Sequence, residues 1–334
     1  MVETDICIIG AGPVGLFAVF EAGLLKMRCH VVDVLPQIGG QLSEIYPKKP
    51  IYDIPGFPEV KAQELVENLR RQIVPFKPTF TLGEKVNSLE KKEGGSFILT
   101  TSDETEIHSK VVVIAGGLGC FEPRKPELEN LENFEGKGVV YMVKDPETFR
   151  NKKLVIAGGG DSALDWTIYL AELAENVTLI HRNESFRGTP DSAEKVAELA
   201  SSGKINLLLN SNLQAVHGNG VVRSVSYIDK EKKVREIDAD YLIPLFGLSP
   251  KLGPMAGWGL NLDKNAIQVN TLDYATNIEG IFAIGDINTY PGKLKLILCG
   301  FHEAALMAQS AFKFVYPQQK LSFKYTTVNG INAF

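Results

Sequence analysis

The chain has 334 residues, enough for two domains of ordinary size. Hydrophobic residues make up 44% and charged residues 22%, the balance of a globular protein with a buried core. The net charge of −5 and the even spread of basic residues exclude nucleic acid as an expected partner. The apolar run at residues 6–9, beside an acidic N-terminus, is too short to span a bilayer, and no later run is long enough. We therefore expect a cytoplasmic protein with no membrane contact.

The cysteines carry no signature of their own. They stand at positions 7, 29, 120 and 299, and no two are close in the sequence. This spacing has no metal-ligand pattern, no C-x-x-C redox pair and no framework of secreted disulfides. We expect structural thiols and no metal site.

The first predicted elements are a strand, a glycine-rich turn, a helix and a second strand. They cover residues 5–9, 10–15, 16–25 and 29–33 in that order. The turn reads G-x-G-x-x-G, and this context is the one in which such a turn indicates a dinucleotide site.

The same unit occurs again 148 residues later. A strand at residues 153–157 leads into a second glycine-rich turn at 158–163, a helix follows from 164 to about 174, and residues 177–181 form the next strand. Two such turns in the same context predict two dinucleotide sites in one chain.

Each position of the two turns has a physical role. The first glycine permits a tight turn off the strand, the second lets backbone N–H groups approach a pyrophosphate, and a small third residue lets the helix pack closely. The N–H groups and dipole at the helix N-terminus would hold the anion. These positions are Gly10, Gly12 and Gly15 in the first turn and Gly158, Gly160 and Ala163 in the second. The predicted contacts also include their neighbours Pro13, Asp161 and Ser162.

The ends of the second strands distinguish the two sites. Each lies 23 residues after the first glycine of its turn, at Asp33 in the first unit and at His181 in the second. A carboxylate there accepts hydrogen bonds from ribose hydroxyls and repels a 2′-phosphate, which suits the adenosine of FAD or NAD. Arg182 and Arg187 follow His181, and guanidinium groups suit the 2′-phosphate of NADPH. The alternative is that both arginines are solvated loop residues.

A third signal lies far downstream. Residues 276–284 predict a strand that closes on Gly285 and Asp286. In two-dinucleotide flavoproteins such a pair ends a strand beside the flavin, where the carboxylate bonds the ribitol chain; alone, the pair is a common turn. The pattern of residues 296–315 predicts a helix whose N-terminal dipole would face the charge of a reduced flavin.

Both ends of the chain must build one domain, because the first turn and the downstream strand serve the same FAD. We therefore predict an α/β fold, a two-dinucleotide-binding-domain flavoprotein with three-layer ββα domains. Residues 119–248 would form a NADPH domain inserted into a discontinuous FAD domain of residues 1–118 and 249–334. Alternating patterns near residues 96–101 and 221–228 predict the antiparallel strands of the third layers.

The chain resembles the thioredoxin-reductase-like family of bacterial ferredoxin–NADP⁺ reductases over essentially its whole length. The segment with the sequence Tyr-Pro-Lys-Lys at its start is the most specific feature, because thioredoxin reductase itself lacks it. The stretches that carry the resemblance are residues 10–15, 39–42, 45–58, 158–163, 181–182 and 285–286.

The resemblance implies FAD contacts spread along the chain. Asp33 would hold the adenosine ribose, Asp286 the ribitol, and Tyr46 would stack on one face of the isoalloxazine. The C-terminal tail would cross from the other subunit of a homodimer, bringing Tyr325 and Thr327 to the second face of the ring. Further contacts are expected from Gly40, Gln41, Val86, Phe121 and Gly285. On the residues alone, Val86, Phe121 and Tyr325 have the character of core or tail positions.

One departure from thioredoxin reductase is chemical. Residues 141–145 occupy the stretch where that enzyme has its C-x-x-C pair, and they contain no cysteine. A disulfide reductase needs two thiols within bridging distance. A smaller departure is Asn183, which stands where a second consecutive arginine is common in the family and so weakens the preference for NADPH over NADH.

The predicted function is hydride transfer from NADPH to flavin N5, followed by single-electron transfer to ferredoxin or flavodoxin. The cofactor carries this chemistry, so no acid–base residue is predicted. The alternatives are a flavin-dependent reductase of quinones or low-molecular-weight disulfides, and a non-enzymatic flavoprotein that senses nucleotides. A basic rim for an acidic ferredoxin is predicted at Lys48, Lys49, Lys293 and Lys295.

Overall fold

The structure, a computed structural model, describes residues 1–321, 326, 330, 331 and 334, without the side chains of 120–122 and 248–250. These residues form two compact units: Met1–Phe121 with Pro250–Phe334, and Glu122–Ser249. Every helix in the described part of the chain is too short or too polar to cross a membrane.

The first unit is built on a seven-stranded sheet in the order β5-β2-β1-β8-β7-β6, with β20 also paired to β8. β1 runs parallel to β2 and β8, whereas β6, β7 and β8 form an antiparallel meander. The strands are β1 (Val2–Ile9), β2 (Cys29–Asp33), β5 (Thr79–Leu82), β6 (Val86–Lys91), β7 (Phe97–Thr101), β8 (Glu106–Ile114) and β20 (Ile281–Ala283).

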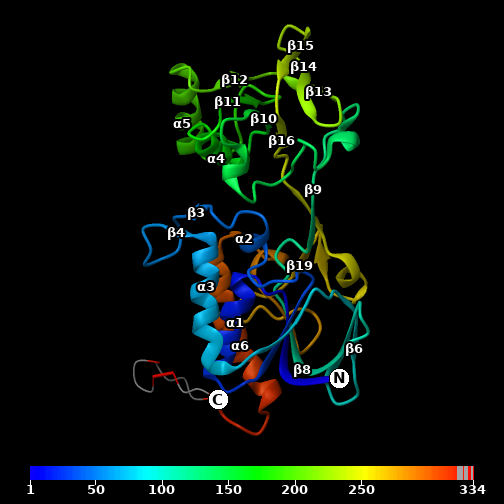
Figure 1. Ribbon diagram of the computed structural model, residues 1–334. Coiled ribbons are helices and arrows are strands. Elements are labelled where there is room, and N and C mark those ends of the chain that lie inside the picture. The colour runs from blue at the N-terminus through cyan, green and yellow to red at the C-terminus, as the bar shows by residue number, and fades with distance from the viewer. Residues whose placement is uncertain (322–325, 327–329, 332–333) are drawn as a thin grey trace. The chain divides into compact units, whose positions relative to one another are not determined.

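Three helices pack together beside this sheet (Figure 1): α1 (Pro13–Leu24), α3 (Ala62–Ile73) and α6 (Ile297–Val315). α1 is apolar nearly all round because the strands and both other helices cover it. α3 instead buries one stripe, which includes Leu65, Leu69 and Ile73. This packing fixes the N-terminus of α1 at the end of β1.

Shorter elements complete the first unit and the two segments that connect it to the second unit. The helical turns are α2 (Gln41–Glu44), η1 (Val74–Phe76), η4 (Gly253–Gly257) and η5 (Gly285–Ile287). The short strands are β3 (Pro50–Ile51), β4 (Val60–Lys61), β9 (Cys120–Pro123), β17 (Leu248–Lys251), β18 (Leu262–Asp263), β19 (Ala266–Gln268) and β21 (Asn288–Thr289).

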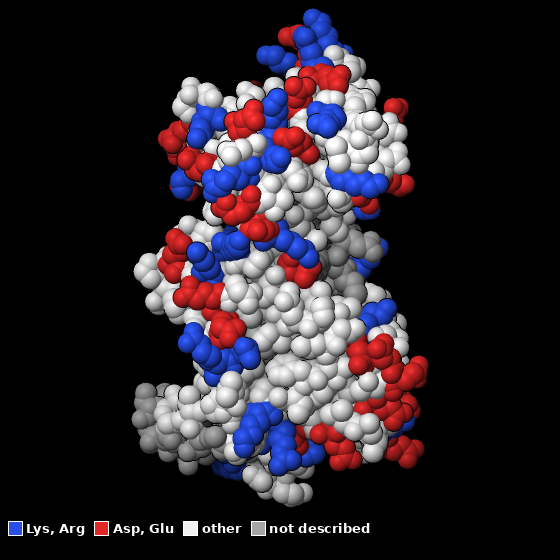
Figure 2. Space-filling view, in the orientation of Figure 1, with Lys and Arg blue, Asp and Glu red and all other residues white. Residues whose placement is uncertain are grey.

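The second unit has a parallel sheet in the order β12-β11-β10-β16 and a separate antiparallel sheet, β13-β14-β15. Val155, Val225 and Leu242 belong to the core between these layers. On the face seen in Figure 2, acidic and basic side chains are interspersed over the described residues of this unit. Its elements are η2 (Leu131–Phe134), η3 (Pro146–Phe149), β10 (Lys153–Ala157), α4 (Asp161–Leu170), β11 (Asn176–Ile180), α5 (Pro190–Ser201), β12 (Asn206–Leu208), β13 (Asn212–Gly218), β14 (Val222–Ile228), β15 (Val234–Asp238) and β16 (Tyr241–Pro244).

The predicted α/β fold is confirmed. Each compact unit contains one strand–turn–helix–strand unit with parallel strands, β1 with β2 in the first and β10 with β11 in the second. Two predicted lengths are wrong. The helix after the second turn covers Asp161–Leu170 and does not continue to residue 174. The strand predicted from residue 276 begins only at Ile281, because the Thr276 hydroxyl donates to the Ile281 carbonyl at 2.9 Å and closes a turn.

Candidate functional site

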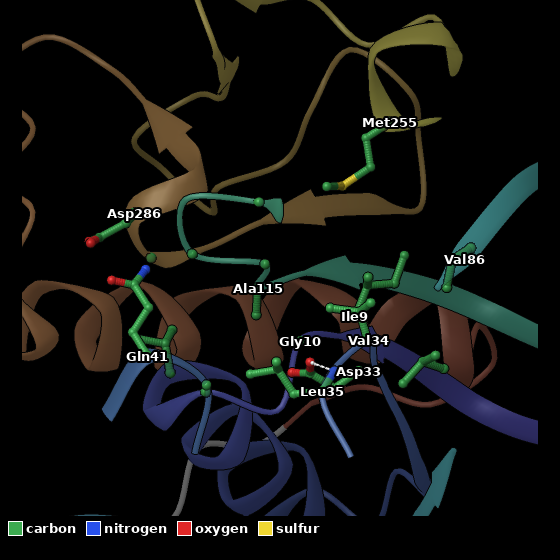
Figure 3. Close-up of a pocket in the computed structure, with 18 of the residues that line it drawn as sticks. Ile9, Gly10, Asp33, Val34, Leu35, Gln41, Val86, Ala115, Met255 and Asp286 are labelled. Carbon is green, nitrogen blue, oxygen red and sulfur yellow. Dashed lines mark hydrogen bonds between the residues drawn. The ribbon is translucent and has the colours of Figure 1, made fainter. Parts of the chain in front are cut away.

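A long pocket lies in the first unit where the parallel strands β1, β2 and β8 end (Figure 3). β1 lies between β2 and β8, and the carboxyl ends of strands at such a switch point are where α/β sheets bind ligands. The predicted contacts that line this pocket are Gly10, Gly12, Pro13, Asp33, Gly40, Gln41, Tyr46, Val86, Gly285 and Asp286.

The glycines of the first turn are needed for different reasons. Gly10 has φ +116°, and a Cβ there would lie 2.3 Å from the Ala115 carbonyl oxygen. A Cβ on Gly15 would lie 2.0 Å from the Gly10 oxygen, so this residue is buried beneath the turn and does not line the pocket. Gly12 differs, because a Cβ there would meet no atom of the chain within 4 Å. The fold therefore requires Gly10 and Gly15, and it leaves open space beside Gly12.

Asp33 ties the end of β2 to the glycine-rich turn. Its Oδ2 accepts a hydrogen bond from the Ala11 N–H at 2.6 Å, and its Oδ1 accepts one from the Leu35 N–H at 2.8 Å. Burial raises the pKa of the Asp33 carboxyl, and the two N–H groups oppose that shift. Each carboxylate oxygen has more than one lone pair, so the carboxylate can still accept hydrogen bonds from hydroxyls of a ligand.

Further polar side chains of the predicted site lie at one end of the pocket. Gln41 and Asp286 lie at this end in Figure 3, Val86 lies at the opposite end, and Asp33 lies between them. Tyr46 is also in the lining, where burial and then the charge of Asp286 raise its pKa to about 12. Its hydroxyl is therefore protonated at neutral pH. The end with Gln41 and Asp286 is thus polar, whereas the end with Val86 combines that apolar side chain with its neighbours Glu84 and Lys85.

A second pocket lies within the second unit, at the ends of β10 and β11. Its lining includes the predicted residues Gly158, Gly160, His181, Arg182 and Arg187. The nearest atom to a Cβ built on Gly160 is a guanidinium nitrogen of Arg187, at 3.5 Å, an ordinary contact. The turn thus leaves space for an anion beside two guanidinium groups.

His181 is held as a neutral ring beside these arginines. Its Nε2 is 3.1 Å from the Ser185 carbonyl oxygen, and its ring centroid is 5.2 Å from that of Phe186. Burial lowers the pKa of His181, and the charge of Arg182 lowers it further against the opposing bond to Ser185. The positive charge of this pocket therefore comes from the guanidinium groups.

Several predicted contacts lie elsewhere. Asp161 and Ser162 are exposed at the start of α4 but outside the pocket lining, and the Asp161 Oδ1 accepts a hydrogen bond from the Thr189 N–H at 2.7 Å. Ala163 is buried under the turn. The Phe121 side chain, Tyr325 and Thr327 lie outside the described residues.

The pockets also contain residues that the sequence did not reveal. Met255 and Trp258, in and just after η4, line the first pocket, as do Glu84 and Lys85. The additions in the second pocket include Arg124, whose charge was an available signal. These positions follow no motif, so only the folded chain brings them to the sites.

The predicted basic rim is wrong at Lys293. Its side chain is 6% exposed and forms an ion pair with the buried Glu303, so it cannot meet a docking protein. Lys49 lies with its Nζ 5.8 Å from the centroid of the Tyr46 ring, close to the first pocket. A run of lysines in a sequence does not distinguish a solvated face from a buried ion pair.

Comparison with known proteins identifies the relatives of this chain. Residues 4–305 match the pyridine nucleotide-disulphide oxidoreductase family. Ferredoxin–NADP reductase of Flavobacterium johnsoniae is 61% identical, covering 100% of this chain and 95% of its own. Ferredoxin–NADP reductase 1 of Christiangramia forsetii is 60% identical, with coverage of 100% and 96%.

Solved structures with the same fold include disulfide reductases. Thioredoxin reductase of Lactococcus lactis has a TM-score of 0.80 at 26% identity, covering 94% of this chain and 99% of its own. Bacillithiol disulfide reductase of Staphylococcus aureus has a TM-score of 0.77 at 20% identity, covering 96% and 100%, a likeness of fold alone.

Proposed function

Because the chain belongs to the pyridine nucleotide-disulphide oxidoreductase family, we propose that it is a ferredoxin–NADP⁺ reductase. The observation that carries the proposal is the pairing of two different pockets in one chain. One is lined by the carboxylate of Asp33 at the end of β2, and the other is lined by Arg182 and Arg187. The first suits FAD and the second suits NADPH.

The residues of the first pocket fit FAD along its whole length. The space beside Gly12 at the N-terminus of α1 suits the pyrophosphate, since helix N–H groups and the helix dipole bind anions. Asp33 would accept hydrogen bonds from the adenosine ribose, with the adenine toward Val86. Asp286 would bind the ribitol at the polar end. This order of groups along the pocket is the order of groups along FAD.

Bound there, FAD would accept a hydride from NADPH and release electrons singly. The protein's part is to hold and shield the ring. Tyr46 would cover one ring face as a neutral phenol, which excludes water without adding charge. Gln41 would donate to polar atoms of the ring or ribityl region. No side chain of the described pocket is assigned as a proton donor.

The second pocket would hold NADPH through its phosphates. The turn beside Gly160 and the N-terminus of α4 suit the pyrophosphate, while Arg182 and Arg187 would pair with the 2′-phosphate. We further propose a homodimer in which the tail of one subunit brings Tyr325 and Thr327 to the flavin of the other. A cytoplasmic location fits the free thiols of Cys7, Cys29 and Cys299.

The proposed function is tested by anaerobic reduction with NADPH followed by profiling of electron acceptors. We expect NADPH to bleach the flavin absorbance in a stopped-flow experiment, and we expect the reduced protein to transfer electrons to ferredoxin or flavodoxin. Disulfide and quinone acceptors serve as comparisons. Absence of flavin bleaching, or reduced protein that gives no electrons to either protein acceptor, would contradict the proposal.

A disulfide reductase is the second candidate, because the solved structures of this fold include thioredoxin reductase. Two of the described thiols, Cys7 and Cys29, do not suit it. Burial raises the pKa of Cys7 to about 12 and raises that of Cys29 as well, so neither forms a thiolate at neutral pH.

This difference gives a direct test. We expect the double variant Cys120→Ser with Cys299→Ser to keep ferredoxin reduction within about twofold of wild type, because the flavin would meet its acceptor without a thiol relay. Iodoacetamide should not inhibit this variant further, since Cys7 and Cys29 are buried. Loss of turnover in the double variant with FAD still bound would favour thiol chemistry instead.

A further inference from the structure

A buried carboxylate that no sequence motif singles out lies beside the first pocket. Glu303 is in α6, and its side chain is 0% exposed. Its Oε2 accepts hydrogen bonds from the Gly285 N–H at 2.6 Å and from the Asn288 Nδ2 at 2.8 Å. Its Oε1 accepts hydrogen bonds from the Tyr290 hydroxyl at 2.9 Å and from the Lys293 ammonium. Four donors from one loop thus converge on one carboxylate.

The charges of this cluster balance. Lys293 is buried with Glu303, and its Nζ also lies 5.2 Å from the centroid of the Tyr290 ring. Burial and the hydrogen bond to Glu303 raise the pKa of the Tyr290 hydroxyl, so it remains a donor. A buried ion is tolerated when its lone pairs or protons are satisfied in this way. Removing one partner leaves the other charge without compensation.

The cluster touches the proposed flavin site through the backbone of Gly285. This glycine has φ +77°, a left-handed conformation, and its N–H is directed to Glu303. The next residue, Asp286, lines the pocket. Glu303 therefore fixes the turn from which the Asp286 carboxylate projects.

Charge links the same residues. Burial raises the pKa of Asp286, the positive charges of Lys295 and Lys293 oppose that rise, and the charge of Glu303 adds to it. Lys293 thus lies near enough to be attracted to Asp286, but the Lys293 ammonium forms its ion pair with Glu303. Without the charge of Glu303, we expect the ammonium of Lys293 to be drawn toward the Asp286 carboxylate.

We propose that Glu303 is a positioning residue of the flavin site, which fixes the Gly285–Asp286 turn and holds Lys293 so that Asp286 can accept hydrogen bonds from the ribitol hydroxyls. The identity of the ligand rests on the proposed function. Glu303 itself does not line the pocket, so it acts through Asp286 and is not a catalytic residue.

The experiment measures the Kd of apoprotein for FAD by quenching of flavin fluorescence, alongside thermal unfolding of the apoprotein. Glu303→Gln keeps an acceptor for the Gly285 N–H but releases Lys293, so we expect the Kd to rise at least tenfold. Adding Lys293→Met removes the competing cation, and we expect the Kd to return to within threefold of wild type. A purely structural ion pair would not give this rescue, because both variants lack the pair.

The backbone contact has its own test. Glu303→Leu with Lys293→Met has no acceptor for the Gly285 N–H, and we expect it to bind FAD about tenfold more weakly than Glu303→Gln with Lys293→Met. Ser310→Ala is the matched control in α6. It removes a hydrogen bond to Asp273 about two helical turns beyond Glu303, leaves the donors to Glu303 in place, and should leave the Kd unchanged.

Each outcome decides the inference. If Glu303→Gln does not fold, the two double variants still test the backbone contact. Equal Kd values for these folded double variants, or a wild-type Kd in Glu303→Gln, would overturn the positioning role. Wild-type protein that binds FAD but does not reduce ferredoxin would contradict the proposed function without affecting this inference. Wild-type protein that binds no FAD would overturn both.

Discussion

Replacing Arg182 and Arg187 together by alanine is expected to raise the KM for NADPH about a hundredfold and to change the KM for NADH less than threefold. A hydrogen bond between a guanidinium group and a phosphate contributes about 1.5–3 kcal/mol, and solvent weakens such bonds at exposed side chains. Two of them should together contribute about 3 kcal/mol, which is about a hundredfold. Steady-state kinetics with both nucleotides and a fixed acceptor measures the effect.

The structure supports this expectation because both arginines line the second pocket with the Gly160 turn. Asn183 lies in the same lining without charge, so Asn183→Ala is the matched control and should alter both KM values little. Similar losses for NADPH and NADH in the double arginine variant would show that the two side chains do not recognise a 2′-phosphate.

Gly12→Ala is expected to weaken FAD binding more than a hundredfold while the apoprotein unfolds within about 2 °C of wild type. The residue has φ −70°, which alanine adopts freely, and a Cβ would meet no atom of the chain within 4 Å. Substitutions of this kind are neutral or slightly stabilising. A methyl group there would, however, occupy the space proposed for the pyrophosphate. Fluorescence titration and thermal unfolding separate the two effects.

Gly15→Ala gives the contrasting result. Its Cβ would lie 2.0 Å from the Gly10 carbonyl oxygen, so we expect loss of stability even without FAD. A Gly12→Ala protein that binds FAD as tightly as wild type would mean that the pyrophosphate does not lie at the first turn.

The sequence predicted the parts of the sites that depend on local rules. The first two glycines of each turn, Asp33 and His181 follow fixed spacings within single strand–turn–helix–strand units, and these residues line the two pockets. Such units are short, so the residues that make the turn and the residues that meet a ligand are close in sequence.

The rest depends on contacts between distant segments. Met255 lines the first pocket from η4, more than a hundred residues after β8, and no pattern in the sequence predicts this position. Lys293 looked like a surface cation because its partner, Glu303, lies on the next helix, and the charge of one residue does not show its burial. The strand is shorter than predicted because the Thr276 N–H and hydroxyl both donate to the Ile281 carbonyl and close a turn before the strand.

The discontinuity of the first unit has a consequence for synthesis on the ribosome. β8 pairs with β1 from the start of the chain and with β20 from near its end, so the central sheet lacks a strand until Ala283 has been translated. Asp286 and α6 emerge later still, whereas the unit Glu122–Ser249 is complete before either. Because domains fold as units during translation, the inserted unit can fold first. On the proposed flavin site, the nascent chain can then capture its flavin only after Asp286 has been translated.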